Sequence, residues 1–100
     1  MSENPKPFRV FAPGDTIVDE LAARGWTQSR LSEIMGRPLQ LVNAICRGRR
    51  AITPGTALEL GAAFGTSAQF WLNLETRYRL WLAEQRTSDL EAIRLRAKAG

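Results

Sequence analysis

The chain has 100 residues, of which 44% are apolar, and its formal net charge is +4. A chain of this length supports a single domain with one modest core. One cysteine and the absence of histidine exclude an internal disulfide, a zinc site of the usual kind and catalytic groups built on histidine. We therefore expect no metal, no cofactor and no enzymatic activity.

The sequence carries no signal for export or membrane insertion. It has no run of 18 apolar residues, and its N-terminal segment lacks the apolar stretch of a signal peptide. We expect a cytoplasmic protein without membrane contact.

Residues 1–13 are predicted to form a flexible N-terminal arm, because they contain three prolines and no helical periodicity. Phe8, Val10 and Phe11 in this arm could dock as a short extended segment.

Five helices are predicted within residues 14–86, which we expect to form one folded domain. Thr27 and Thr53 are suitable N-caps, and Pro38 and Pro54 suit a first helical turn, where an N–H would have no helical partner. Gly36 can adopt the left-handed conformation that ends a helix. The apolar periodicity and these signals place the helices at about 15–24, 27–35, 38–47, 54–64 and 67–86.

Residues 87–100 are weakly amphipathic, with Leu90, Ile93 and Leu95, and predict a C-terminal helical tail. No strand pattern or repeat competes. The predicted fold is therefore all-α, with five helices, the fifth of them long, and a helical tail.

The basic charge is concentrated in residues 27–50, which hold five arginines and one glutamate, whereas the rest of the chain is nearly balanced. A basic patch of this kind is typical of nucleic-acid binding, because cations that neutralise phosphates release condensed counterions. A solvated basic surface is the alternative reading of the charge alone.

The predicted helices at 27–35 and 38–47 have the spacing of a helix-turn-helix. A helical wheel of the second helix places its core face around Leu41, Val42 and Ile45. The opposite face is slim and polar, and the residues that we expect to read bases are Leu39, Gln40, Asn43 and Ala44. Asparagine and glutamine can bond adenine through two parallel hydrogen bonds, leucine can touch a thymine methyl, and alanine permits close approach. Ordinary solvent-facing side chains are the alternative for Gln40 and Asn43.

Phosphate contacts are expected around this face, from long cations and from the start of the preceding helix. The residues assigned to them are Thr27, Gln28, Arg37, Arg47, Arg49 and Arg50. Cys46 is expected to be a small residue at the edge of the core rather than a reactive thiol.

The resemblance to a known family rests on the spacing of Gln28, Leu31, Ser32, Met35, Gly36, Val42, Ile45 and Gly48. This pattern resembles the helix-turn-helix of phage lambda-type repressors, the xenobiotic-response-element (XRE) group of regulators. Three blocks are similar to those of the HigA (VapI-like) antitoxins of bacterial toxin-antitoxin modules, and together they cover about residues 13–82: PGDTIVDELAARGWTQSRL, GRRAITPGTALELGAAFGTS and FWLNLETRYRL. Ser32 departs from the pattern, since such repressors usually carry alanine there; serine fits if its hydroxyl bonds a carbonyl one turn back.

The resemblance implies a lambda-repressor-like domain that binds a palindromic operator as a dimer and represses its own promoter. It also implies that the protein neutralises a RelE-like ribonuclease toxin of the HigB type and is associated with the bacterial nucleoid. The recognition positions of the family fall on Leu39, Gln40, Asn43 and Ala44, in agreement with the helical wheel.

The predicted helix at 67–86 carries two lines of side chains. We expect a core stripe that consists of Phe70, Trp71, Leu74, Tyr78, Trp81 and Leu82. The second line, on the opposite side, has no obvious core to face and consists of Leu72, Thr76, Leu80 and Ala83. We assign Leu72, Leu80 and Ala83, with the tail, to a homodimer interface, because a two-fold DNA reader needs a self-complementary face. Plain surface leucines are the alternative.

Two other functions stay open at this point. One is a stand-alone regulator of the same fold without a toxin partner, and the other is a protein-interaction module whose basic face meets an acidic partner. Similar domains also occur fused to a metallopeptidase, but that activity is excluded because the chain contains no HExxH motif. RNA binding is disfavoured because no aromatic platform accompanies the basic patch.

Overall fold

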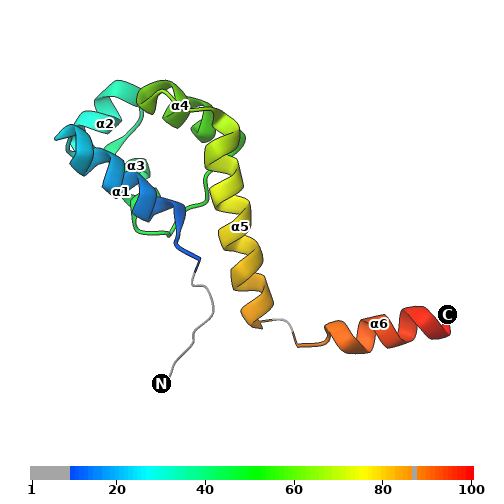
Figure 1. Ribbon diagram of the computed structural model, residues 1–100. Helices are drawn as coiled ribbons and strands as arrows, with labels where there is room; N and C mark the ends of the chain where they lie inside the picture. The colour runs from blue at the N-terminus through cyan, green and yellow to red at the C-terminus, as the bar shows by residue number, and fades with distance from the viewer. Residues whose placement is uncertain (1–9, 87) are drawn as a thin grey trace, which may run out of the picture.

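The computed structural model describes residues 10–86 and 88–100. Within these ranges the fold is all-α, as predicted, with no strand. The helices are α1 Pro13–Arg24, α2 Gln28–Met35, α3 Leu39–Cys46, α4 Pro54–Phe64, α5 Ala68–Arg86 and α6 Leu90–Ala99. Figure 1 shows α1 to α4 gathered around the first part of α5, while the rest of α5 extends away from this body and α6 lies beyond its end. Of the predicted N-terminal docking segment, Phe8 lies outside the described residues.

The helix-turn-helix is built by local capping. The Thr27 side chain accepts a hydrogen bond from the Arg30 N–H at 3.0 Å and so caps α2, as predicted. Gly36 ends α2 with φ 69°, in the left-handed region that a side chain disfavours, and the chain reverses into α3. Pro38 was expected in the first turn of α3. It instead precedes the helix as its N-cap, with an extended ψ of 145°. Its carbonyl still accepts the first helical bonds, from Leu41 and Val42.

The core lies where α1, α2, α3, α4 and the first turns of α5 meet. Trp71 is its largest member and is 0% exposed; its indole N–H donates to the Thr66 hydroxyl at 2.7 Å. The Phe64 ring packs against Trp71, with a centroid distance of 5.7 Å. The other buried hydrophobic residues are Ile17, Leu21, Leu31, Leu41, Val42, Ile45, Ile52, Ala57 and Leu60.

The start of α1 lies directly against the end of α3. A Cβ added at Gly14 would lie 2.4 Å from the Cys46 carbonyl oxygen and 2.6 Å from that of Ile45. This close approach leaves no room for a side chain at position 14. The helix begins at Pro13, two residues before the predicted start, with the proline at its first position, where no N–H is needed.

Three predictions about packing are wrong. The spacing of apolar residues in the fourth helix predicts a packing face that includes Leu58 beside Ala57 and Leu60, but Leu58 is 65% exposed on the outer side of α4. Leu72 was expected to face no core, but it is half-buried and packs against the core cluster. The predicted core stripe of α5 is only partly buried: Phe70, in the first turn, is 40% exposed. Tyr78, Trp81 and Leu82 are only half-buried, because the helix there has left the body.

Candidate nucleic-acid interface

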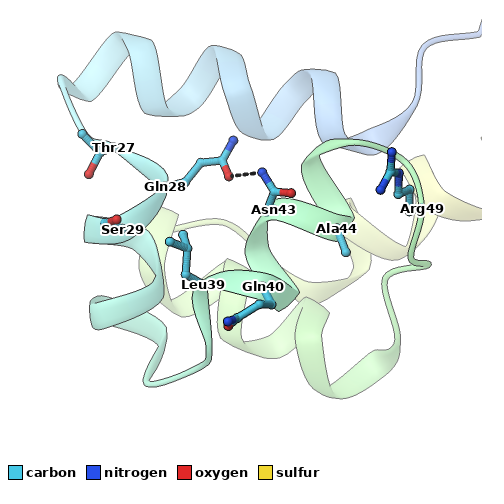
Figure 2. Close-up of a pocket in the computed structure, with 8 residues that line it drawn as sticks. All are labelled: Thr27, Gln28, Ser29, Leu39, Gln40, Asn43, Ala44 and Arg49. Carbon is cyan, nitrogen blue, oxygen red and sulfur yellow. Dashed lines mark hydrogen bonds between the residues drawn. The ribbon is translucent and has the colours of Figure 1, made fainter.

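The N-terminus of α2 and the outer face of α3 enclose a hollow of about 520 Å³. Figure 2 shows Gln28 of α2 and Asn43 of α3 pointing toward one another, while Ala44 points away from α2. Its lining residues are Thr27, Gln28, Ser29, Leu39, Gln40, Asn43, Ala44 and Arg49. The structure therefore brings all four predicted base-reading residues together with three of the six predicted phosphate contacts.

The division of α3 into two faces agrees with the helical wheel. Leu41, Val42 and Ile45 are buried in the core. On the other face Gln40 is exposed, and Leu39, at the helix start, is 43% exposed. Leu39 is therefore accessible from outside, as its predicted contact with a thymine methyl requires.

Asn43 is held in place by Gln28. Its Nδ2 donates to the Gln28 Oε1 at 3.2 Å, so one side chain from each helix is joined across the hollow (Figure 2). This bond uses one N–H of the Asn43 amide and leaves its second N–H and its Oδ1 for other partners. A donor and an acceptor side by side are what adenine requires in the major groove. Periodicity within one helix could not predict this link, because the two residues belong to different helices.

The predicted arginines fall into two groups. Arg47, Arg49 and Arg50 lie in the loop 47–53 between α3 and α4, and in the described part of the chain none of them forms an ion pair. Arg37 differs, because its Nη1 lies 2.8 Å from the Glu59 Oε1 of α4. This ion pair ties Arg37 to the protein itself and away from the hollow, which was not expected.

The first turn of α2 adds a residue that sequence reasoning missed. Ser29 lines the hollow next to Thr27 and Gln28, at a helix N-terminus, where backbone N–H groups have no helical partner. Its position two residues after the N-cap is the signal that could have identified it, because such N–H groups and nearby hydroxyls bind anions.

A helix-turn-helix family model matches residues 18–71 of the chain. The chain belongs to the HigA-like helix-turn-helix family. It is similar to Virulence-associated protein I of Dichelobacter nodosus, with 37% identity over 82 residues that cover 81% of this chain and 76% of that protein. It is also similar to Antitoxin HigA-1 of Vibrio cholerae, with 33% identity over 81% of this chain and 77% of that one.

The similarity extends to the three-dimensional structure of a solved relative. The Pseudomonas aeruginosa antitoxin HigA with the higBA promoter is 34% identical to this chain and superposes with a TM-score of 0.77, covering 85% of this chain and 91% of that one. The family resemblance inferred from the three sequence blocks is thereby confirmed, including its lambda-repressor-like fold.

The one departure of this HigA-like chain from the family pattern is accommodated locally. The Ser32 hydroxyl donates to the Ser29 carbonyl at 2.9 Å, as predicted. The half-buried hydroxyl therefore has a partner within its own helix, and serine replaces alanine without leaving a polar group unpaired.

The described residues of this HigA-like chain contain no group of three His, Cys, Asp or Glu side chains that could hold a metal ion. None of their helices combines the length and apolar character needed to cross a bilayer. Burial raises the pKa of the Cys46 thiol, so the thiol stays protonated near neutral pH and behaves as the core-edge residue expected from the sequence.

Proposed function

We propose that this protein is a sequence-specific DNA-binding repressor that acts as the antitoxin of a HigB/HigA-type toxin-antitoxin module. The observation that carries the proposal is the hollow between α2 and α3, which collects the candidate base-reading side chains on one exposed face. In this role the protein works on nucleoid DNA in the bacterial cytoplasm.

Base reading is assigned to α3, inserted into the major groove. Gln40 and Asn43 each bond one adenine, and each such pair of hydrogen bonds is worth about 1–3 kcal/mol against a wrong base. The Gln28 bond holds the Asn43 amide in position before DNA arrives, so less side-chain entropy is lost on binding. Leu39 and Ala44 form the apolar part of the face.

Phosphate contacts are assigned to the margins of the face. Thr27, Gln28 and Ser29 at the start of α2 meet one strand, and Arg47, Arg49 and Arg50 meet the backbone beside α3. These contacts orient the helix and carry the salt dependence of binding without reading sequence. Arg37 stays a weaker member of this set, because its guanidinium is already paired with Glu59.

A palindromic operator requires two copies with their α3 helices about 34 Å apart. The distal half of α5 is the face that we assign to this dimer, through Leu80, which is 58% exposed, and Ala83, which is also exposed. Leu72 belongs to this line by periodicity but packs against the core, so its contribution is indirect.

The toxin partner is the HigB-type ribonuclease. Support comes from family membership, since a relative from Vibrio cholerae is named an antitoxin. Co-expression with the product of any small adjacent gene tests this part: relief of growth arrest and co-purification support an antitoxin. A toxic neighbour that is neither relieved nor bound would leave a stand-alone regulator.

The DNA part is tested by selecting bound fragments from random and genomic DNA with the wild type and with Gln40→Ala plus Asn43→Ala. We expect an inverted repeat near the gene itself, with half-sites about one helical turn apart, that the double variant no longer selects. The matched control is Gln69→Ala plus Asn73→Ala, which removes the same two residue types from the exposed face of α5, where they bond each other at 2.8 Å. Equal, sequence-independent retention by all three proteins would refute base reading by α3.

A further inference from the structure

The arginine loop, residues 47–53, is fastened at both ends. Its first half is bonded to α3, since the Arg49 N–H donates to the Ala44 carbonyl at 2.8 Å. Its second half is bonded to α5, since the Ile52 N–H donates to the Glu75 Oε1 at 3.1 Å. The second bond joins residues 23 positions apart and connects the loop to a helix that does not flank it.

Glu75 is an unusual residue to find at this place. Only 7% of it is exposed, and Trp71 is the other buried residue of α5. A buried carboxylate is costly unless it is both paired and hydrogen-bonded. Glu75 meets both conditions, because Oε1 accepts from Ile52 and Oε2 pairs with Arg79 one turn along the helix.

Arg79, which belongs to α5 itself, supplies the positive charge that the Glu75 carboxylate needs. The carboxylate therefore does not need an arginine of the loop as its charge partner. Within the described chain, Arg47, Arg49 and Arg50 have no ion-pair partner and their charges remain available. The Glu75 carboxylate therefore binds the loop through its backbone, and the arginine side chains of the loop remain available to bind an anion such as a phosphate.

We propose that Glu75 is a positioning residue for DNA binding, which holds the loop 47–53 through the Ile52 N–H so that its arginines face the phosphate backbone. The buried Ile52 side chain keeps the loop close to the core, but one apolar side chain does not set the direction of the neighbouring backbone. The hydrogen bond does, because an N–H must point at its acceptor. This inference rests on the proposed function, since it assigns the loop to phosphate.

The salt dependence of binding distinguishes this role from a purely structural one. The logarithm of the affinity falls linearly with the logarithm of the salt concentration, and each phosphate contact makes this slope steeper by about 0.9. Loss of the loop contacts makes the slope shallower by about 2–3. A loss of stability alone lowers the fraction of active protein and leaves the slope unchanged. Slopes are measured by anisotropy on a duplex between about 50 and 200 mM salt, at a temperature where circular dichroism shows every variant folded.

Three variants separate the groups involved. Glu75→Leu fills the same space without an acceptor, and Glu75→Gln keeps an amide oxygen for Ile52 while it removes the charge. Leu74→Ala, a neighbouring α5 residue that packs against the core, is the stability control. We expect a reduced slope and faster hydrogen exchange of the Ile52 amide in Glu75→Leu, and near wild-type values of both in Glu75→Gln and Leu74→Ala.

The outcomes are decisive for each claim separately. A wild-type slope in folded Glu75→Leu, or a protected Ile52 amide in that variant, overturns the positioning role. If the wild type prefers no DNA sequence, the proposed repressor fails, whereas the Glu75 inference is still decided by the slopes on non-selective DNA. If Glu75→Leu does not fold, Glu75→Gln decides: faster exchange of the Ile52 amide in Glu75→Gln together with an unchanged salt slope overturns the positioning role.

Discussion

The two halves of α5 differ in burial: the first packs into the body and the second extends away from it. Its first turns insert Trp71 into the core and hold Glu75 beneath the loop 47–53, while its last turns leave the body with Leu80 exposed and Trp81 half-buried. Tyr78 and Trp81 stack on each other at 6.4 Å in place of a core. The difference shows that an aromatic-rich stripe does not by itself define a core, because packing needs a second element opposite it.

The contrast also corresponds to the two roles that we propose, DNA binding and self-association. The body presents the hollow and the basic loop, and the distal half of α5 and α6 present apolar side chains without a covering element in the described chain, including Leu90, Ile93 and Leu95. Self-association through the distal region would complete its packing and set the spacing of two recognition faces.

The largest expected effect is the loss of Trp71. Trp71→Ala should destabilise the domain by about 3–5 kcal/mol, because the indole is fully buried and a cavity remains. Trp81→Ala, at dilute protein concentration, should cost no more than about 1 kcal/mol, the order of one ring-ring contact. Urea denaturation followed by circular dichroism checks both, and equal losses would abolish the contrast between the two halves.

A smaller effect is expected where α1 meets α3. Gly14→Ala should destabilise by about 1–3 kcal/mol, because its Cβ would lie within 2.4 Å of a backbone carbonyl that cannot rotate away. Gly55→Ala is the matched control, since a Cβ there meets nothing within 4 Å, and it should stabilise by about 0.4–1 kcal/mol. Thermal unfolding of the two variants should move the midpoint in opposite directions; a neutral Gly14→Ala would show that the two helices can separate.

The smallest effect on folding is expected from the exposed leucine of distal α5. Leu80→Glu should change the free energy of unfolding of the dilute protein by less than about 0.5 kcal/mol, because the side chain is largely in solvent. It should nevertheless weaken self-association, since it places a charge in the proposed dimer face.

Sedimentation velocity over a range of concentrations measures that weakening. Leu58→Glu is the control, because Leu58 is equally a solvent-facing leucine but lies on α4. An unchanged concentration dependence in Leu80→Glu would remove distal α5 from the dimer. Leu72→Glu is unsuitable for this test, since Leu72 packs against the core.

Much of the fold and of the candidate site was predictable because it rests on local chemistry. The Thr27 cap, the Gly36 turn and the polar face of α3 each depend on residues within a few positions of one another. The family blocks then connected this face with DNA. The sequence did not reveal the Gln28 to Asn43 bond or the pairing of Arg37 with Glu59, because each joins residues that are distant along the chain. Ser29 was missed although its position two residues after the N-cap is a local signal.

By itself the sequence determined the ends of the helices to within about two residues, and which face of α3 is polar, since capping and a period of 3.6 residues act over one or two turns. Only the tertiary structure decided that Leu58 lies outside, that Leu72 packs inside and that the carboxylate of Glu75 is buried beneath the arginine loop. The physical reason is distance along the chain. Burial and hydrogen bonding between residues such as Ile52 and Glu75 depend on how whole helices meet, and that arrangement minimises the exposed apolar surface of the domain rather than of any single segment.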